Sequence, residues 1–245
     1  MTEIEIINGH KFFSFIQGET IDLCVPNVDE SVIEVWSQWF NNSETTRYLD
    51  QGVFPNSIDD QKAFLELTRR KKDRLLLLIR PKGANYYAGV ASLSFINFET
   101  RGCGIAHVIG KRVDDIDSLF YSLEAKCRLT EHAFEKLGMQ RIESGQAVDL
   151  KEWQRIQTLF GYRVEGIKRN YFRKGQYVAD CVVTSCIFED YLRLKKKRGG
   201  NLWPGKNKLF KMIKKLPAES TYDRLEKWMS QEYQNIEELV LSLSE

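Results

Sequence analysis

The sequence predicts an α/β (α+β) protein in which a mixed central sheet is flanked by helices and followed by a C-terminal helical extension. Strand-sized apolar segments alternate with longer segments whose apolar residues recur at helical spacing, and three strand-like segments follow one another between residues 74 and 109. The chain has 42% hydrophobic and 29% charged residues, which is typical of a soluble globular protein. Its 245 residues suit one sizeable domain with an appendage, or two small domains.

The elements are expected in the order β-α-α-β-β-β-α-β-α-β-β. Pro26 ends the first strand, and Asp29 or Ser31 can cap the helix that follows. Ser57 can cap the next helix, and Gly138 is suited to a left-handed C-cap after the long third helix. The expected strands and helices lie at residues 21–25, 31–40, 57–67, 74–79, 87–95, 103–109, 124–137, 141–147, 150–159, 162–168 and 177–188.

Several classes of protein are excluded because their sequence patterns are absent. The apolar run at residues 75–79 is of strand length, and no run is long enough to cross a bilayer. The segment Met1–Glu5 lacks the basic-then-apolar order of a signal peptide. The five cysteines form no Cys-x-x-Cys pair and the three histidines have no metal-ligand spacing, so no metal site is indicated. We therefore expect a cytoplasmic protein without a metal.

The charge changes sign within the last fifth of the chain. Every charged residue from Arg193 to Lys215 is basic, and acids dominate from Glu219 to Glu245. We therefore expect a main domain at residues 1–190, a basic linker with a short helix at 191–216, and an acidic amphipathic helical tail at 217–245. The basic segment could bind nucleic acid or an acidic partner. The apolar stripe of the tail needs a partner surface, so a homodimer is left open.

The run from Gly110 to Gly166 carries short motifs in a fixed order. They are Ile109-Gly110, Glu124-Ala125, Phe134-Glu135-Lys136-Leu137-Gly138, Arg141-Ile142-Glu143, Phe160-Gly161-Tyr162 and Glu165-Gly166. This order resembles the GNAT superfamily of N-acetyltransferases, in its ribosomal-protein and sugar-amine acetyltransferase-like branch. The resemblance covers roughly residues 20–190 and implies a GNAT fold, with residues 1–190 as a GNAT-like acyltransferase domain. In this fold Val108 and Ile109 are expected on a central strand that splays from the strand at 141–147.

The resemblance implies acetyl-CoA as the cofactor. The end of the strand at 103–109 would lie along the pantetheine arm, and residues 117–122 would form a pyrophosphate loop ahead of a helix that opens at Glu124. The implied cofactor-binding residues are Val108, Ile109, Gly110, Lys111, Arg112, Ser118, Leu119, Phe120, Tyr121 and Ser122. However, Ser118 and Phe120 stand where the family has glycines, and nearby acids would repel a phosphate. We therefore expect this degenerate loop to bind acetyl-CoA weakly or not at all.

Transfer of an acyl group to an amine needs a base, an oxyanion donor and an acid for the leaving thiolate. His107 is the candidate base because an imidazole titrates near neutral pH, although a histidine on a strand can equally be a core residue. Tyr121 and Tyr162 are candidate acids, and Glu99 is a further carboxylate in the preceding loop. Gln157 stands where the family has its tyrosine, so that feature is lost.

Two functions remain open from the sequence. The first is an acyl-CoA-dependent N-acyltransferase, with acetyl as the acyl group, that acts on a primary amine of a small molecule, a sugar or a protein. The polar segment at 41–49 would then wall the acceptor pocket. The second is a GNAT-fold pseudoenzyme that has lost cofactor binding and acts as a binding or structural module. The fold favours the first function, and the segment at 117–123 favours the second.

Overall fold

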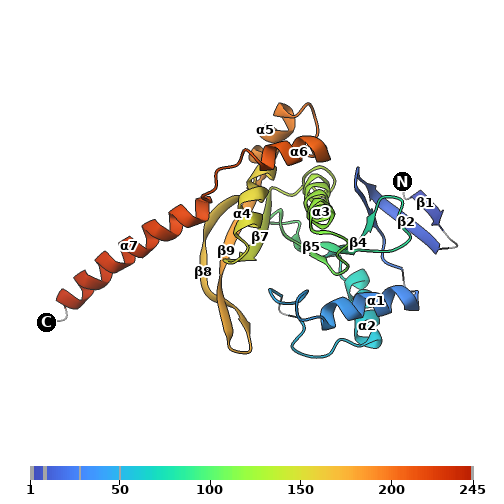
Figure 1. The fold of residues 1–245 in the computed structure, drawn as a ribbon, viewed down its shortest axis with the longest axis horizontal. Helices are drawn as coiled ribbons and strands as arrows, with labels where there is room; N and C mark the ends of the chain where they lie inside the picture. The colour runs from blue at the N-terminus through green and yellow to red at the C-terminus, as the bar shows by residue number, and fades with distance from the viewer. Residues whose placement is uncertain (1–2, 8–9, 28, 50, 244–245) are drawn as a thin grey trace.

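The computed structural model describes residues 3–7, 10–27, 29–49 and 51–243, which form one nine-stranded sheet with helices on both faces (Figure 1). The strands are β1 (Glu3–Ile7), β2 (His10–Gln17), β3 (Ile21–Cys24), β4 (Leu75–Pro81), β5 (Gly89–Asn97), β6 (Gly102–Ile109), β7 (Arg141–Ala147), β8 (Arg163–Lys174) and β9 (Tyr177–Ile187). The helices are α1 (Glu30–Asn41), α2 (Ile58–Arg70), α3 (Asp115–Glu135), α4 (Lys151–Ile156) with a 3-10 turn at Gln157–Phe160, α5 (Phe188–Lys197), α6 (Lys206–Ile213) and α7 (Thr221–Ser242).

The sheet divides between β6 and β7. The strand order is β1-β2-β3-β4-β5-β6-β7-β9-β8, and every pair is antiparallel except β6 with β7. These two strands pair only over Gly102–Gly104 and Arg141–Glu143. Beyond that point β6 continues beside β5 and β7 continues beside β9, so the two halves of the sheet diverge. The predicted splay between the strands at 103–109 and 141–147 is therefore confirmed.

The predicted order of elements from the first strand to the final hairpin is also confirmed. Ser57 caps α2 as expected, and its Oγ accepts the N–H of Asp60 at 3.1 Å. Strands β1 and β2 were not expected, and they extend the sheet beyond β3. The mixed sheet with flanking helices is thus the predicted fold class with an additional N-terminal hairpin.

Helix α3 begins at Asp115, more than two turns before the predicted start. Asp114 is its N-cap, because Asp114 Oδ1 accepts the N–H of Asp117 at 2.6 Å. Phe120 lies on the inner face of this added stretch and is buried in the core. The prediction of a loop at 117–122 is therefore wrong. The segment is helical because Asp114 caps it and Phe120 is buried.

Apolar side chains fill both faces of the sheet. The larger cluster joins one face to α3 and to the segments that follow it, including the buried Tyr191 of α5. The smaller cluster joins the other face to α1 and α2, through Trp36, Trp39 and Leu65. Figure 1 shows α3 and the α1–α2 pair on opposite sides of the sheet. The splay between β6 and β7 lies between these two layers.

The C-terminal extension has a docked part and a projecting part. Leu202, Trp203 and Leu209 are buried in the larger cluster, so the expected basic linker packs on the core. A boundary between residues 190 and 191 would cut through α5. In contrast, α7 points away from the body, with Tyr222 buried at its base and most of its length exposed (Figure 1).

Candidate active site

The candidate site lies where β6 and β7 part. Pairing ends at Gly104 and Glu143, so the facing edges of the two strands have backbone groups that the sheet ladder leaves unpaired. Two cavities, of about 700 and 330 Å³, open on this gap. Residues that line both cavities show that the cavities meet there: Tyr48, Leu49, Ile105, Ala106, Ser144, Gly145 and Phe172.

The narrower cavity runs along the second half of β6. Residues expected at the cofactor or catalytic site line it: His107, Val108, Ile109, Arg112 and Ser122. Leu150 and Trp153 close its side from the α4 region. The cavity is therefore a slot with apolar and polar walls that follows a strand edge, and its charged lining residues are Arg112 and Glu44.

The His107 side chain lines this slot and is uncharged at neutral pH. Its ring packs against Trp153, with the ring centroids 4.7 Å apart. Burial, followed by the nearby positive charge of Lys126, lowers the pKa of His107 to about 3. The expectation that this imidazole titrates near neutral pH is therefore wrong, and at neutral pH it is a weak base.

The start of α3 offers little to a pyrophosphate. Asp114 occupies the N–H of Asp117, and Ser118 Oγ accepts the N–H of Val113 at 3.4 Å. These contacts use groups that a phosphate would otherwise bind. The Phe120 side chain is buried in the larger cluster, whereas the resemblance implies a glycine here that would let a ligand approach.

The cations near this helix start are partly engaged. Lys206 Nζ of α6 lies 2.5 Å from Asp117 Oδ1. Lys111 Nζ lies 3.9 Å from the centroid of the Tyr86 ring. Arg112 is exposed and lines the narrower cavity. At this end of the narrower cavity, Arg112 is therefore the cation that faces a ligand.

The other candidate catalytic residues lie apart from the gap. Tyr162 is fully buried, with its hydroxyl 2.8 Å from Thr130 Oγ1. Tyr121 is half-buried on α3, and burial raises its pKa. Glu99 lies in the exposed turn that precedes β6, whereas His107 lies near the other end of that strand. Neither of the two cavities described above is lined by Tyr162, Tyr121 or Glu99.

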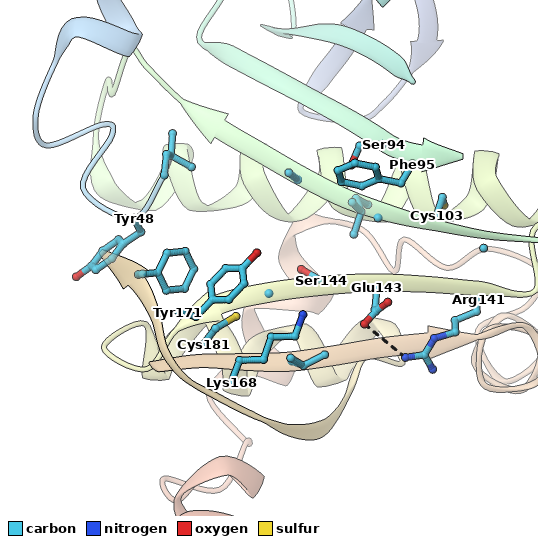
Figure 2. A pocket seen from close by; sticks show the side chains of 18 of the residues that line it. Tyr48, Ser94, Phe95, Cys103, Arg141, Glu143, Ser144, Lys168, Tyr171 and Cys181 are labelled. Carbon is cyan, nitrogen blue, oxygen red and sulfur yellow. Dashed lines mark ion pairs between the residues drawn. The ribbon is translucent and has the colours of Figure 1, made fainter. Parts of the chain in front are cut away.

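The wider cavity lies on the other side of the gap, between β6, β7 and the β8–β9 hairpin. Figure 2 shows the side chains of Ser144, Lys168 and Tyr171 around this space. Glu143 is its acidic residue, 3.8 Å from the guanidinium of Arg141. Tyr48 and other aromatic residues give the cavity apolar walls, so it can accept a ligand with both polar and apolar parts.

A buried polar network lies behind the gap, and sequence reasoning missed it. Lys126 of α3 is 1% exposed, and its Nζ lies 3.2 Å from Ser144 Oγ and 2.9 Å from Gln157 Oε1. Gln157 Nε2 donates to Gln146 Oε1 at 2.6 Å, and Gln146 Nε2 donates to Ser144 Oγ at 2.7 Å. Thr184 Oγ1 completes the network at 3.3 Å from Gln146 Nε2.

One sequence signal could have found this network. Lys126 lies three residues after Leu123, four before Thr130 and seven before Ala133, and all three of these residues are buried. A lysine in such a helical stripe faces the core. Ser144 carries no comparable signal, because its position at the splay depends on tertiary structure.

The sequence was compared with known proteins. No family model matches it, and no curated protein matches it either. Among solved structures, spermidine N-acetyltransferase from Vibrio cholerae in complex with CoA and spermine has 15% identity and a TM-score of 0.60, covering 71% of this chain and 99% of that one. RimL, a ribosomal L7/L12 alpha-N-protein acetyltransferase, has 17% identity and a TM-score of 0.58, covering 76% and 100%.

A third similar structure is the microcin C7 self-immunity acetyltransferase MccE in complex with acetyl-CoA and AMP. It has 19% identity and a TM-score of 0.57, covering 70% of this chain and 94% of that one. The chain has the GNAT acetyltransferase fold. The sequence resemblance is thus confirmed at the level of the fold, and the parting of β6 from β7 is the feature of this GNAT fold on which both cavities open.

Within the described residues, no group of three or more His, Cys, Asp or Glu side chains is arranged to hold a metal ion. No helix in the described part of the chain is both long and apolar enough to cross a membrane.

Proposed function

We propose that the protein is an acyl-CoA-dependent N-acyltransferase that transfers an acetyl group to a primary amine. The observation that carries this proposal is the meeting of two cavities at the parting of β6 and β7. One cavity can hold an acyl donor and the other an amine, so that the two reactants come together at Ala106 and Ser144. Holding two reactants in contact is itself a large part of catalysis.

The narrower cavity suits the arm of the donor. When bound, acetyl-CoA supplies an activated acyl thioester. The unpaired strand edge beyond Gly104 can donate and accept hydrogen bonds along an extended arm, in the way a further strand would. Trp153 and His107 supply an apolar wall that excludes water from the acyl group.

The phosphate end of the donor has less support. Because the Asp114 cap and the Lys206–Asp117 pair satisfy the start of α3, Arg112 is the cation best placed for a phosphate. We therefore expect most of the binding free energy to come from the arm and the acyl group. The affinity for acetyl-CoA would then be weak, as the sequence also predicts.

The wider cavity suits the amine. The Glu143 carboxylate can pair with an ammonium group, and the Tyr48 and Tyr171 rings can pack against the apolar part of the same ligand. With a volume of about 700 Å³, this cavity has room for a small molecule, a sugar or the end of a protein chain. The spermidine and L7/L12 enzymes of the same fold are named for amine substrates of two of these kinds.

Calorimetry with acetyl-CoA and with S-acetylpantetheine tests the donor site. We expect both to bind, with affinities within about tenfold of each other, because the phosphate end contributes little. Thiol release with a panel of primary amines then tests transfer. Ala106→Trp should abolish both binding and transfer by filling the place where the cavities meet, whereas Ala218→Trp, at an exposed position, should change neither.

The absence of any donor binding would favour the second function, a GNAT-fold binding module. The acids at the start of α3 favour this second function, because they repel the phosphates of a CoA donor. In that case amines should still bind the wider cavity without transfer, which equilibrium dialysis can measure.

A further inference from the structure

Lys126 is an unusual buried amine. Its Nζ lies among Ser144, Gln157 and the Tyr162 ring, whose centroid is 3.8 Å away. No salt bridge to Lys126 is found among the described residues. A lysine that is buried without a carboxylate usually loses its proton, because burying an unpaired charge costs several kcal/mol.

The surroundings of Lys126 favour the neutral amine. Burial lowers the pKa of Lys126 to about 7, and the nearby thiol of Cys186 opposes this shift. The titratable groups that face it are His107 on β6, Tyr162 just before β8 and Cys186 on β9. Burial keeps all three uncharged at neutral pH, so none of them stabilises the ammonium form as a carboxylate would.

Ser144 connects this amine to the gap. The Ser144 side chain is half-buried and lines both cavities, whereas Lys126 lines neither. A neutral Lys126 can donate to Gln157 Oε1 and still accept the hydroxyl proton of Ser144 with its lone pair. Gln146 Nε2 donates to the same Ser144 oxygen at 2.7 Å and would stabilise negative charge on it.

We propose that Ser144 and Lys126 form a nucleophile–base pair that takes up acyl groups from activated esters and thioesters. A hydroxyl nucleophile within hydrogen-bond reach of a base, with that base oriented by a third group, is the arrangement that covalent acyl transfer requires. Here the nucleophile is Ser144, the base is Lys126 and the orienting group is Gln157. This proposal deepens the acyl transfer proposed above. Only the identity of the natural acyl donor, acetyl-CoA, rests on that proposed function.

The first half-reaction forms an acyl-serine. Ser144 Oγ bonds to the acyl carbon while its proton passes to Lys126 Nζ, and the bond from the acyl carbon to the leaving oxygen or sulfur breaks. The Lys126 ammonium then gives its proton to the leaving group. The products are acylated Ser144, a neutral lysine and a free alcohol, phenol or thiol.

The second half-reaction returns the pair to its starting state. An amine or a water molecule from the wider cavity bonds to the acyl carbon and passes a proton to Lys126. The bond between Ser144 Oγ and the acyl carbon breaks, and Ser144 recovers the proton from Lys126. The product is an amide when the acceptor is an amine, and a carboxylic acid when it is water.

An activated ester tests the pair without CoA. The full chain is incubated with p-nitrophenyl acetate, nitrophenol release is followed, and the acetylated residue is located by peptide mass spectrometry. We expect an initial burst, acetylation of Ser144, and a rate that rises as the pH passes through about 7 and Lys126 loses its proton. This result does not depend on acetyl-CoA binding. The experiment can therefore support the Ser144–Lys126 pair even if acetyl-CoA is not the donor, and it can reject the pair even if acetyl-CoA binds.

Variants of Lys126 and Ser144 test whether Lys126 acts as the base or only supports the structure. Lys126→Met keeps a long apolar stem in the core, and we expect it to slow acylation at least 100-fold and to remove the rise near pH 7. Ser144→Ala should abolish the burst, and Ser144→Cys should restore acylation as a thioester. Ser185→Ala is the matched control, because Ser185 also contacts a cation, at 3.1 Å, but lines neither described cavity.

Acetylation at other residues only, or acylation of Ser144 that Lys126→Met leaves at the original rate and pH profile, would overturn the proposal. Circular dichroism establishes that each variant is folded. If Lys126→Met does not fold, Lys126→Arg serves instead, since a guanidinium stays protonated and cannot act as the base. It must then show the same loss of rate.

Discussion

The buried carboxylate of Glu124 accepts the backbone N–H of Thr20 at 2.6 Å, across 104 residues of sequence. The same carboxylate accepts the N–H of Glu19 at 2.7 Å and lies 3.0 Å from Arg128. It therefore satisfies the turn between β2 and β3 and fixes the position of α3 on the sheet. Gly18 belongs to this arrangement, since a Cβ there would lie 2.6 Å from Glu124 Oε1.

Removal of this carboxylate should destabilise the whole fold. Glu124→Ala leaves the part-buried N–H groups of Glu19 and Thr20 without this acceptor and removes one of the two carboxylate partners of Arg128, so we expect it to lower the free energy of unfolding by about 2–4 kcal/mol. Glu124→Gln keeps one acceptor and should cost less. Urea unfolding measures both. Glu66→Ala is the control, because its ion pair with Arg70 at 3.9 Å is exposed and should contribute less than about 0.5 kcal/mol.

Gly110 marks a close approach between the end of β6 and α1. A Cβ at this position would lie 2.0 Å from Trp39 Cγ, and Trp39 is itself buried. We expect Gly110→Ala to cost about 1–3 kcal/mol by overpacking. Gly110→Ala should cost less in a Trp39→Ala background than in the wild type, because alanine lacks the Cγ, Cδ1 and Cδ2 atoms that the new Cβ would meet. Strictly additive losses in urea unfolding would show that the clash is absent.

The sequence predicted the body of the fold because its elements carry local signals. Strand β7 was predicted with the bounds that the structure has, and Ser57 was predicted as the cap of α2. The order of elements also sufficed to predict the splay. The start of α3 was missed because the family comparison placed a loop there, although Asp114 is an N-cap residue and Phe120 continues the apolar spacing.

The site was predicted less well than the fold. Val108, Ile109 and Arg112 were predicted to bind the cofactor, and they line the narrower cavity because a strand end places its neighbours together. Tyr162 was predicted as a catalytic acid, but its hydroxyl contacts Thr130 in the core. One aromatic residue in the sequence does not show whether its side chain faces the core or a cavity. The Lys126–Ser144 contact joins α3 to β7 and depends on tertiary packing, which no single segment encodes.

The length of chain that the core requires can be tested by truncation. Leu202, Trp203 and Leu209 are buried in the larger cluster, and each contributes about 1.5–3 kcal/mol by burial. Their sum is comparable to the stability of a whole domain, so a chain ending at Asp190 should not fold. This reverses the expectation from the sequence, in which residues 1–190 suffice.

A chain ending at Glu219 is the matched control for that truncation. It lacks only α7, of which Tyr222 is the buried apolar residue. We expect it to fold, with a loss of at most about 3 kcal/mol. Circular dichroism and thermal melts compare the two truncations with the full chain. A cooperative melt of the chain ending at Asp190 at the temperature of the full chain would contradict the burial argument.

Acid should weaken a cross-strand contact between Glu165 and Arg141. Arg141 Nη1 donates to Glu165 Oε1 at 2.7 Å, and Ser185 Oγ donates to the same oxygen at 2.5 Å. The hydrogen bond from Arg141 is the main cause that lowers the pKa of Glu165 from 4.5 to about 2. Because the folded-state pKa is the lower one, this carboxylate stabilises the fold above pH 4.5, and its contribution is lost as the pH falls towards 2.

Glu165→Gln should therefore reduce the acid sensitivity of the protein. At about pH 7 the variant should be less stable than the wild type, and the difference should shrink steadily between about pH 4.5 and pH 2. Urea unfolding across this range measures the difference. The carboxylate is more than a third exposed, so added salt should also diminish it. Glu66→Gln is the control and should follow the wild type throughout, whereas a constant gap between Glu165→Gln and wild type at every pH would show that Glu165 acts through packing and not through its charge.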